Sequence, residues 1–154
     1  MNIKRLIFLF ILVLFISSCA PLSTEGEEEE CPYTLQITIE DDTYDLTKGN
    51  YKCTFRDGFT KSVEMTDVAS PNQMAEHLVP IQAKTGEEVY FETAGSPNLT
   101  IYLWNTESRH EEIPSKEQKT FTLPTESGEY LFEVVGEWKK DTVHYVFLLE
   151  LTDN

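Results

Sequence analysis

Metal or acid–base chemistry in this chain would depend on three histidines, His77, His110 and His144, and on 27 acidic residues. Histidine metal sites normally use short spacings such as His-x-His, His-x-x-x-His or Cys-x-x-Cys, and the sequence contains none of them. A blue-copper centre needs Cys, Met and two His near the last hairpin, where only His144 is found. We therefore interpret each histidine as a structural or solvated side chain and expect no metal.

Nucleophilic and carboxylate catalysis also lack a recognisable motif. There is no Gly-x-Ser-x-Gly turn and no glycine-rich phosphate loop, because the seven glycines are dispersed at turns. The adjacent acids Asp41-Asp42 and Glu111-Glu112 fall in predicted loops or strand ends, and the loop at Asp41 lacks the glycine and distal glutamate of a calcium loop. The sequence therefore predicts a protein that is not an enzyme and has no cofactor.

Residues 1–18 are typical of an export signal. Lys4 and Arg5 form a charged start, and an uninterrupted apolar run of 11 residues follows, Leu6–Ile16. That run fits the core of a signal peptide, about 7 to 15 residues, and is shorter than the roughly 20 residues of a membrane-crossing helix. We therefore expect the chain to be exported from the cytoplasm.

The residues that follow resemble the lipobox of bacterial lipoproteins. Ile16-Ser17-Ser18-Cys19 places an aliphatic residue, two small residues and a cysteine in the order of that motif. The resemblance implies cleavage after residue 18, a thioether-linked diacylglycerol on Cys19, often a further palmitate-like acyl chain, and anchoring on the outer face of the bacterial cytoplasmic membrane. The alternatives are an ordinary cleavable signal that happens to end in Cys and a buried helix.

The chain is strongly acidic, with a net charge of -15 over 154 residues. Such a charge repels phosphates, which excludes a direct nucleic-acid binder. Residues 20–30 contain five Glu and no apolar periodicity, so we expect residues 19–30 to be the lipidated Cys and a disordered linker. An acidic calcium-binding tract is the alternative. The length predicts one folded domain, residues 31–154.

Cys31 and Cys53 are the thiols that remain once Cys19 carries lipid. Export places both outside the cytoplasm, where disulfides persist, and two cysteines allow one pairing. Cys53 lies between Tyr51 and Phe55 at strand spacing, which suits a buried bridge. We predict a disulfide that joins the first strand to the third, with free buried thiols or a redox pair as alternatives.

The folded region shows the two-residue periodicity of β-strands. The first predicted strand carries Tyr33, Leu35, Ile37 and Ile39 on one face. Turns are predicted at 41–43 and 48–50, and Asp57-Gly58 predicts a hairpin turn. The remaining strands are predicted at 44–46, 51–55, 59–65, 79–84, 87–93, 99–105, 119–123, 129–138 and 142–152.

One short helix is predicted between these strands. Ser70 can cap it, Pro71 suits its first position, and Gln73 completes the pattern of a capping box. The helix should end near His77 or Leu78.

The strand density and one local motif resemble immunoglobulin-like domains. In Gly128-Glu129-Tyr130-Leu131-Phe132 a corner tyrosine stands two residues before a core position, which here is Phe132 in place of Cys. The resemblance implies an all-β, immunoglobulin-like antiparallel β-sandwich, to which the first strands add an N-terminal β-hairpin extension. The order of lipobox, acidic linker and strands also resembles small immunoglobulin-like lipoproteins of Gram-positive bacteria, and that family supplies no catalytic residues.

The last long strands are apolar on both faces. If they are neighbours, their outer face is too apolar to remain wet without reason. Either the N-terminal strands cover it as a second core layer, or it binds a partner or a second copy of the chain. The residues of this predicted outer face are Tyr102, Trp104, Leu131, Val135, Val146 and Leu148.

Taken together, the sequence favours a membrane-anchored extracytoplasmic lipoprotein that acts as a non-catalytic binding module for an unknown protein partner. The alternative is an inhibitor of an exported hydrolase, a role that some bacterial immunoglobulin-like sandwiches serve. That alternative requires exposed Gly-rich and Pro-Trp loops, and Gly136-Glu137-Trp138 is the one similar segment.

Overall fold

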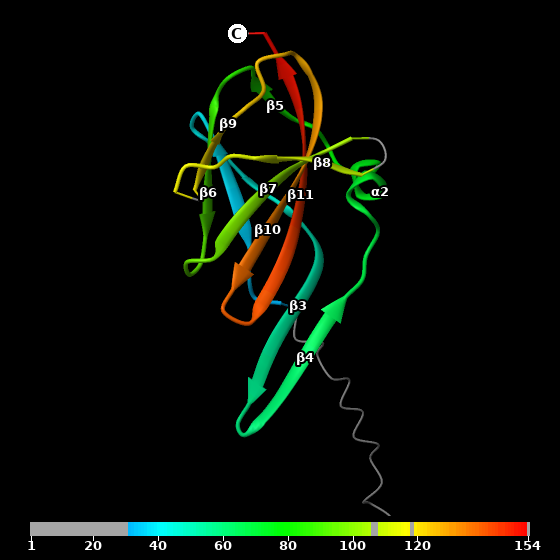
Figure 1. Ribbon diagram of the computed structural model, residues 1–154, viewed down its shortest axis with the longest axis vertical. Coiled ribbons are helices and arrows are strands. Elements are labelled where there is room, and N and C mark those ends of the chain that lie inside the picture. Colours follow the sequence, from blue (N-terminus) through cyan, green and yellow to red (C-terminus); the bar gives the residue numbers. More distant parts are fainter. Residues whose placement is uncertain (1–30, 106–107, 118, 154) are drawn as a thin grey trace, which may run out of the picture.

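Two β-sheets face each other in the computed structural model, which describes residues 31–105, 108–117 and 119–153 (Figure 1). The predicted signal, Cys19 and the acidic linker lie outside the described residues. The first sheet has the strand order β2-β1-β6-β9, and the second has the order β4-β3-β11-β10-β7-β8 with β5 parallel to β11. The strands are β1 Leu35–Ile39, β2 Asp42–Asp45, β3 Thr47–Asp57, β4 Thr60–Thr66, β5 Ile81–Lys84, β6 Glu88–Thr93, β7 Asn98–Trp104, β8 Arg109–Ile113, β9 Thr120–Thr122, β10 Gly128–Trp138 and β11 Asp141–Thr152.

The predicted all-β sandwich is confirmed, and its pairing from β6 onward is that of an immunoglobulin-like domain. β6 pairs with β9 in one sheet, whereas β7, β10 and β11 are neighbours in the other. In that architecture strand B pairs with strand E in one sheet, and strands C, F and G are neighbours in the other. The N-terminal hairpin β1–β2 extends the first sheet beside β6.

The corner tyrosine is also confirmed. The Tyr130 hydroxyl donates a hydrogen bond of 3.0 Å to the backbone oxygen of Glu126, four residues upstream. Two residues later, Phe132 is fully buried, with ring centroids 5.5 Å from Phe121 and 5.1 Å from Phe147. The hydrogen bond of Tyr130 therefore fixes the start of β10, just before its first fully buried side chain.

β10 and β11 form the longest ladder among the described residues, from the pair Gly128 and Leu151 to the pair Trp138 and Asp141. Side chains alternate between the faces of a strand, so one half of this ladder points into the sandwich. Seven residues of this half are buried in the core between the sheets, and Tyr130 and Trp138 pack against it partly exposed: the seven are Phe132, Val134, Val143, Tyr145, Phe147, Leu149 and Leu151.

One interpretation of the sequence placed the N-terminal strands over the outer face of the last long strands, and the structure places them elsewhere. β1 pairs with β6 in the first sheet, and Leu35, Ile37 and Ile39 are buried in the main core between the sheets. They therefore do not cover the outer face of the second sheet, and that interpretation is wrong. Just before β1, the Tyr33 ring stacks on Trp138 with centroids 4.1 Å apart.

The predicted disulfide is confirmed. Cys31 and Cys53 are bonded, with Cα atoms 5.7 Å apart, and both are buried. The Lys48 ammonium donates a 2.6 Å hydrogen bond to the Cys31 carbonyl oxygen. The start of the described chain is thereby held on β3.

β3 is continuous through the turn predicted at residues 48–50, so that turn is wrong. The register of β3 against β11 shifts between Val143 and Tyr145, a β-bulge that accommodates one extra residue of β3. Gly49 lies there, and a Cβ at this position would be 3.5 Å from both the His144 carbonyl oxygen and the Met74 sulfur. These are ordinary contact distances, so the position lies between the sheet and the helix without requiring glycine.

The capping box is confirmed, and it starts α2, Pro71–Ala75. The Ser70 hydroxyl accepts from the Gln73 backbone N–H at 3.5 Å, and the Gln73 side-chain oxygen accepts from the Ser70 N–H at 3.0 Å. The Glu76 C-cap then ends the helix slightly before His77. None of the helices in the described part of the chain has the length and hydropathy to cross a membrane.

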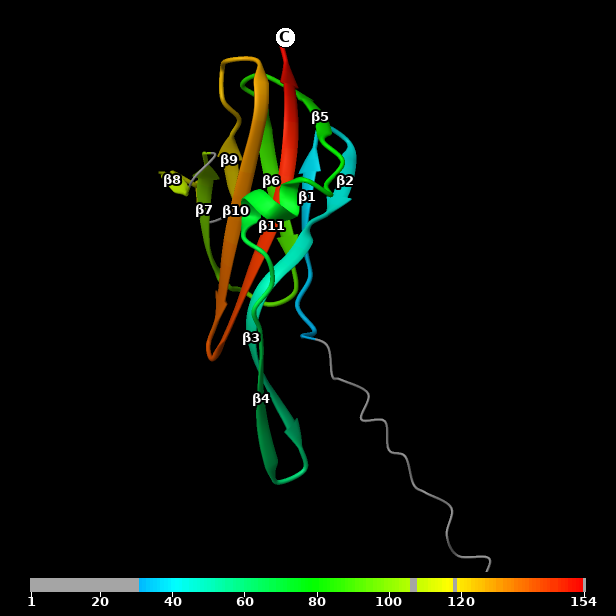
Figure 2. The same ribbon diagram turned by 90° about the vertical axis from the view of Figure 1, so that its right-hand side faces the viewer.

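Beyond the sandwich, β3 and β4 continue as a two-stranded hairpin (Figures 1 and 2). The last registered contact of β3 with β11 is Lys52 opposite Thr142, after which β3 pairs with β4 alone. We call residues 52–65 the arm.

Candidate functional site

The three strands that carry the predicted outer face are neighbours, as the prediction required. Leu131, Val146 and Leu148 are nevertheless buried, whereas Tyr102, Trp104 and Val135 keep part of their surface exposed. The interaction role of this face stays a prediction. The part of the face that a partner could still contact consists of Tyr102, Trp104 and Val135.

The cover of this face is α2 and the residues just after it. Met74, Ala75 and Leu78 pack with the buried trio in a second apolar cluster, separate from the core between the sheets. Figure 2 shows the helix in front of β10 and β11, and both strands contact it. A further tie is the 2.9 Å hydrogen bond from the Asn72 side-chain amide to the Asn105 carbonyl oxygen.

A buried carboxylate lies in the middle of the outer face. Glu133 faces Tyr102 of β7 and Val146 of β11 in register, and its side chain is 5% exposed. Its Oε2 accepts from Trp104 Nε1 at 2.8 Å and from Arg109 Nη2 at 2.7 Å and Nε at 3.0 Å. A buried carboxylate is costly unless it is paired and hydrogen-bonded, and here it is both.

His144 and Tyr102 complete this group. The other carboxylate oxygen, Glu133 Oε1, is 2.6 Å from His144 Nδ1. The Arg109 guanidinium lies over the Tyr102 ring, 3.8 Å from its centroid, in a cation–π contact. We call Tyr102, Trp104, Arg109, Glu133 and His144 the Glu133 cluster.

Opposing effects act on the Glu133 carboxyl. Burial raises its pKa, but the hydrogen bonds from His144, Arg109 and Trp104 and the charge of Arg109 outweigh burial and hold the pKa at about 2. The ordinary value is 4.5. A carboxylate held so far below neutral pH is a weak base, so the geometry suits a fixed acceptor that orients its donors better than it suits proton transfer.

The sequence patterns did not predict that these residues form one group. By its spacing His144 is predicted to be a structural or solvated side chain, and Glu133 lies in a strand whose two faces are otherwise apolar. The signal that could have identified it is one acid inside Leu131-Phe132-Glu133-Val134-Val135, because an acid between apolar neighbours on a buried face needs partners. Arg109 comes from β8, a strand that the sequence analysis did not predict; Glu111 and Glu112, assigned there to loops or strand ends, lie within this strand.

The remaining candidate residues lie apart from the cluster. His77 follows α2, and its backbone N–H donates to the Met74 carbonyl oxygen at 3.0 Å. Trp138 of the Gly136-Glu137-Trp138 segment lies in β10, where its indole N–H donates to the Ala94 carbonyl oxygen at 3.1 Å. That segment therefore supplies no exposed inhibitory loop. Over residues 31–105, 108–117 and 119–153, no group of three or more His, Cys, Asp or Glu could hold a metal ion.

A shallow hollow of about 360 Å³ adjoins the cluster at His144. Lys52 and Met65 at the base of the arm line it, together with Asp67 and Thr142. The hollow therefore joins the outer face of the sheet to the arm.

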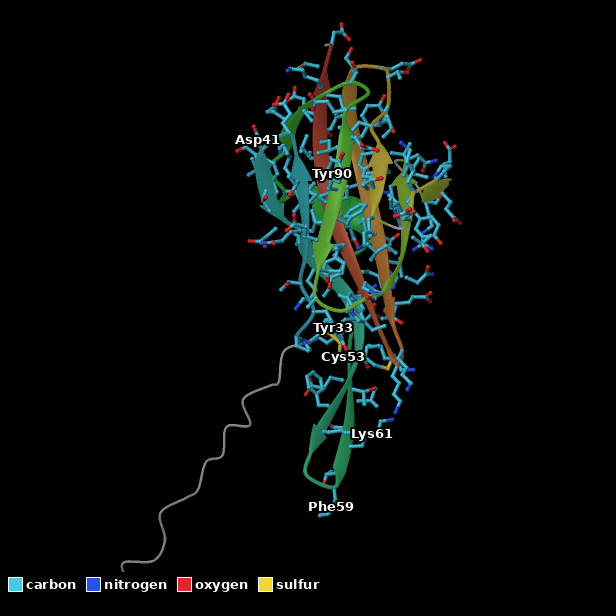
Figure 3. The ribbon with its side chains drawn as sticks, turned by 90° about the vertical axis from the view of Figure 1, so that its left-hand side faces the viewer. Tyr33, Asp41, Cys53, Phe59, Lys61 and Tyr90 are labelled. Atoms are coloured by element: carbon cyan, nitrogen blue, oxygen red, sulfur yellow. A yellow bond between two sulfur atoms is a disulfide. The ribbon has the colours of Figure 1, made fainter. Side chains whose placement is uncertain are left out.

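The arm is the second surface with unusual exposure. Phe59 at its tip is fully exposed, and Met65 and Val63 on β4 are exposed as well. Figure 3 shows Phe59 at the far end of the arm and Cys53 at its base.

Comparison of the chain with protein-family models, characterised proteins and solved structures found no match.

Glu133→Gln should lower the free energy of unfolding at neutral pH and flatten its dependence on pH. The folded pKa lies below the unfolded value, so the ionised carboxyl stabilises the fold above pH 4.5, and this contribution is lost as the pH falls toward 2. A shift of this size corresponds to about 3 kcal/mol. Urea denaturation at several pH values measures the difference between the variant and the wild type.

The matched control is Glu129→Gln, which removes an exposed carboxylate from the same strand. It should leave the pH profile close to that of the wild type. Identical profiles for the two variants would contradict the role assigned to Glu133.

Proposed function

We propose that this protein is a lipid-anchored extracytoplasmic binding module that holds a protein partner at the outer face of the bacterial cytoplasmic membrane. Its anchor would be Cys19, through the lipobox-like segment Ile16-Ser17-Ser18-Cys19. The Cys31–Cys53 disulfide supports the location, because such bonds persist in oxidising compartments.

The observation that carries the binding role is the fixed group of Tyr102, Trp104 and Arg109 on the outer face. Aromatic residues and arginine dominate the energetics of protein interfaces, and side chains already held in place lose less entropy on binding. Here Glu133 holds Trp104 and Arg109 by direct hydrogen bonds, and Arg109 in turn lies on Tyr102. All three side chains remain partly accessible.

The anchor predicts a specific mass for the mature protein. Protein purified from a bacterial membrane fraction should begin at Cys19 and carry the mass of a diacylglycerol, with or without a further acyl chain. Cys19→Ser should abolish that mass and release the protein from the membrane fraction. A wild-type product that begins at another residue without acyl mass would contradict the anchor.

Tyr102→Ser should weaken capture of the partner at least tenfold, because it removes an aromatic contact from the centre of the proposed surface. The measurement is cross-linked pull-down from envelope extracts, quantified by mass spectrometry. Tyr90→Ser is the matched control, since Tyr90 is exposed on β6 in the opposite sheet (Figure 3). Equal recovery of the same proteins with both variants would contradict the assignment of this surface.

A further inference from the structure

The arm packs on the core at its base, through Cys53 and Phe55, and its outer part projects from the sandwich. Five registered pairs, from Cys53 with Glu64 to Asp57 with Thr60, extend past the last registered pair of β3 with β11. At about 3.4 Å per residue, this part of the arm is roughly 17 Å long. An isolated two-stranded hairpin is marginally stable in water. Exposed apolar residues on such a hairpin indicate a surface that binds another molecule.

The register places apolar and basic residues on the same face of the arm. Directly paired residues of an antiparallel hairpin share a face, and so do alternate residues along each strand. The pairs Lys52 with Met65, Thr54 with Val63 and Arg56 with Lys61 therefore form one face, whereas Glu64 pairs with Cys53 on the other. Apart from Thr54, the residues of the first face are well exposed.

This face differs in charge from the rest of the molecule. The chain has a net charge of -15, yet residues 52–65 contain three basic and two acidic residues. The three basic residues share the face that also carries Val63 and Met65. Asp41, by contrast, lies at the end of the sandwich opposite Phe59 (Figure 3). An anionic surface would thus repel most of the protein and attract the arm.

The arm projects from the end of the body at which the described chain begins. Cys31 is bonded to Cys53 at the base of the arm, so the chain enters the fold there (Figure 3). This step rests on the proposed lipid anchor at Cys19. The 11 residues between Cys19 and Cys31 reach about 20 to 35 Å, which exceeds the length of the arm, so the tip of the arm can meet the bilayer that holds the lipid.

We propose that the arm docks on an anionic phospholipid bilayer. Phe59 inserts at the boundary between headgroups and acyl chains, and Arg56 and Lys61, which form the second registered pair from the turn, lie against the lipid phosphates. Burial of an aromatic ring and attraction of basic residues to anionic lipids are the two contributions that hold peripheral segments on membranes. The lipid tether is the first attachment. The arm provides a second one at the same end of the sandwich, so that the rest of the sandwich points away from the membrane.

Vesicle sedimentation tests this docking with the chain 20–154, which lacks Cys19 and keeps the disulfide and both apolar clusters of the described fold. The chain should bind vesicles of equal parts phosphatidylglycerol and phosphatidylcholine more tightly than vesicles of phosphatidylcholine alone. Phe59→Ser should lower the partition coefficient about tenfold or more, given the transfer energy of one aromatic side chain. Lys61→Gln should lower it less and reduce its dependence on salt, and Tyr90→Ser should leave it unchanged.

The lipidated full-length protein provides a second measurement that includes the tether. In Phe59→Trp, brominated acyl chains should quench tryptophan fluorescence beyond the level found for Trp104 and Trp138 in the wild type. Absence of this extra quenching would overturn the proposal. So would a Phe59→Ser chain that binds vesicles as the wild type does, or a Phe59-dependent protein partner without any vesicle binding.

The two proposals fail separately. If the chain 20–154 binds vesicles but the mature wild-type protein lacks acyl mass, the anchor is overturned and the arm remains a lipid-binding element. Acyl mass without Phe59-dependent quenching would keep the anchor and overturn the arm.

Discussion

The antiparallel ladder between β10 and β11 supports both layers of side chains in this protein. Because side chains alternate along each strand, the ladder buries Phe132 and Phe147 between the sheets and Leu131 and Leu148 on the opposite face. The second sheet is built outward from it, with β7 and β8 beyond β10 and with β3 and β4 beyond β11. The helix covers the outer layer, and the first sheet covers the inner one.

Glu133 sets the chemistry of the outer layer. A carboxylate in this position loses its hydration, and the loss is tolerable only because Arg109, Trp104 and His144 replace the water. The donors come from three different strands, so the same acid that costs energy to bury also fixes the edge strand β8 against the sheet. The result is a face whose aromatic and arginine side chains are held in one arrangement before any partner arrives.

Local sequence patterns were sufficient for the features with local causes. The alternation in residues 129–138 and 142–152 predicted both faces of the ladder, Tyr130 predicted the corner, and Ser70 with Gln73 predicted the start of the helix. The disulfide followed from the count of cysteines. In each case the deciding contact joins neighbours in sequence or, for the disulfide, the two cysteines of the described residues.

Features with distant causes were missed. β8, Arg109–Ile113, has no apolar alternation, and its arginine is held by a carboxylate 24 residues away. The helix that covers the outer face has five residues, too few for an apolar periodicity to show which face it packs on. Gly49 resembles a turn residue in the sequence, but it lies inside β3, where the register against β11 shifts.

Hydrogen exchange of the backbone amides tests most directly whether the β10–β11 ladder is the stable centre from which a less stable arm projects. The account predicts that amides of Glu133 and Tyr145 exchange only through global unfolding, whereas amides of the arm beyond Cys53 exchange through local opening at much lower free energy. Equal protection of Ser62, whose amide faces β3 in the pair with Phe55, and Tyr145, or exchange of Glu133 through local opening, would contradict it.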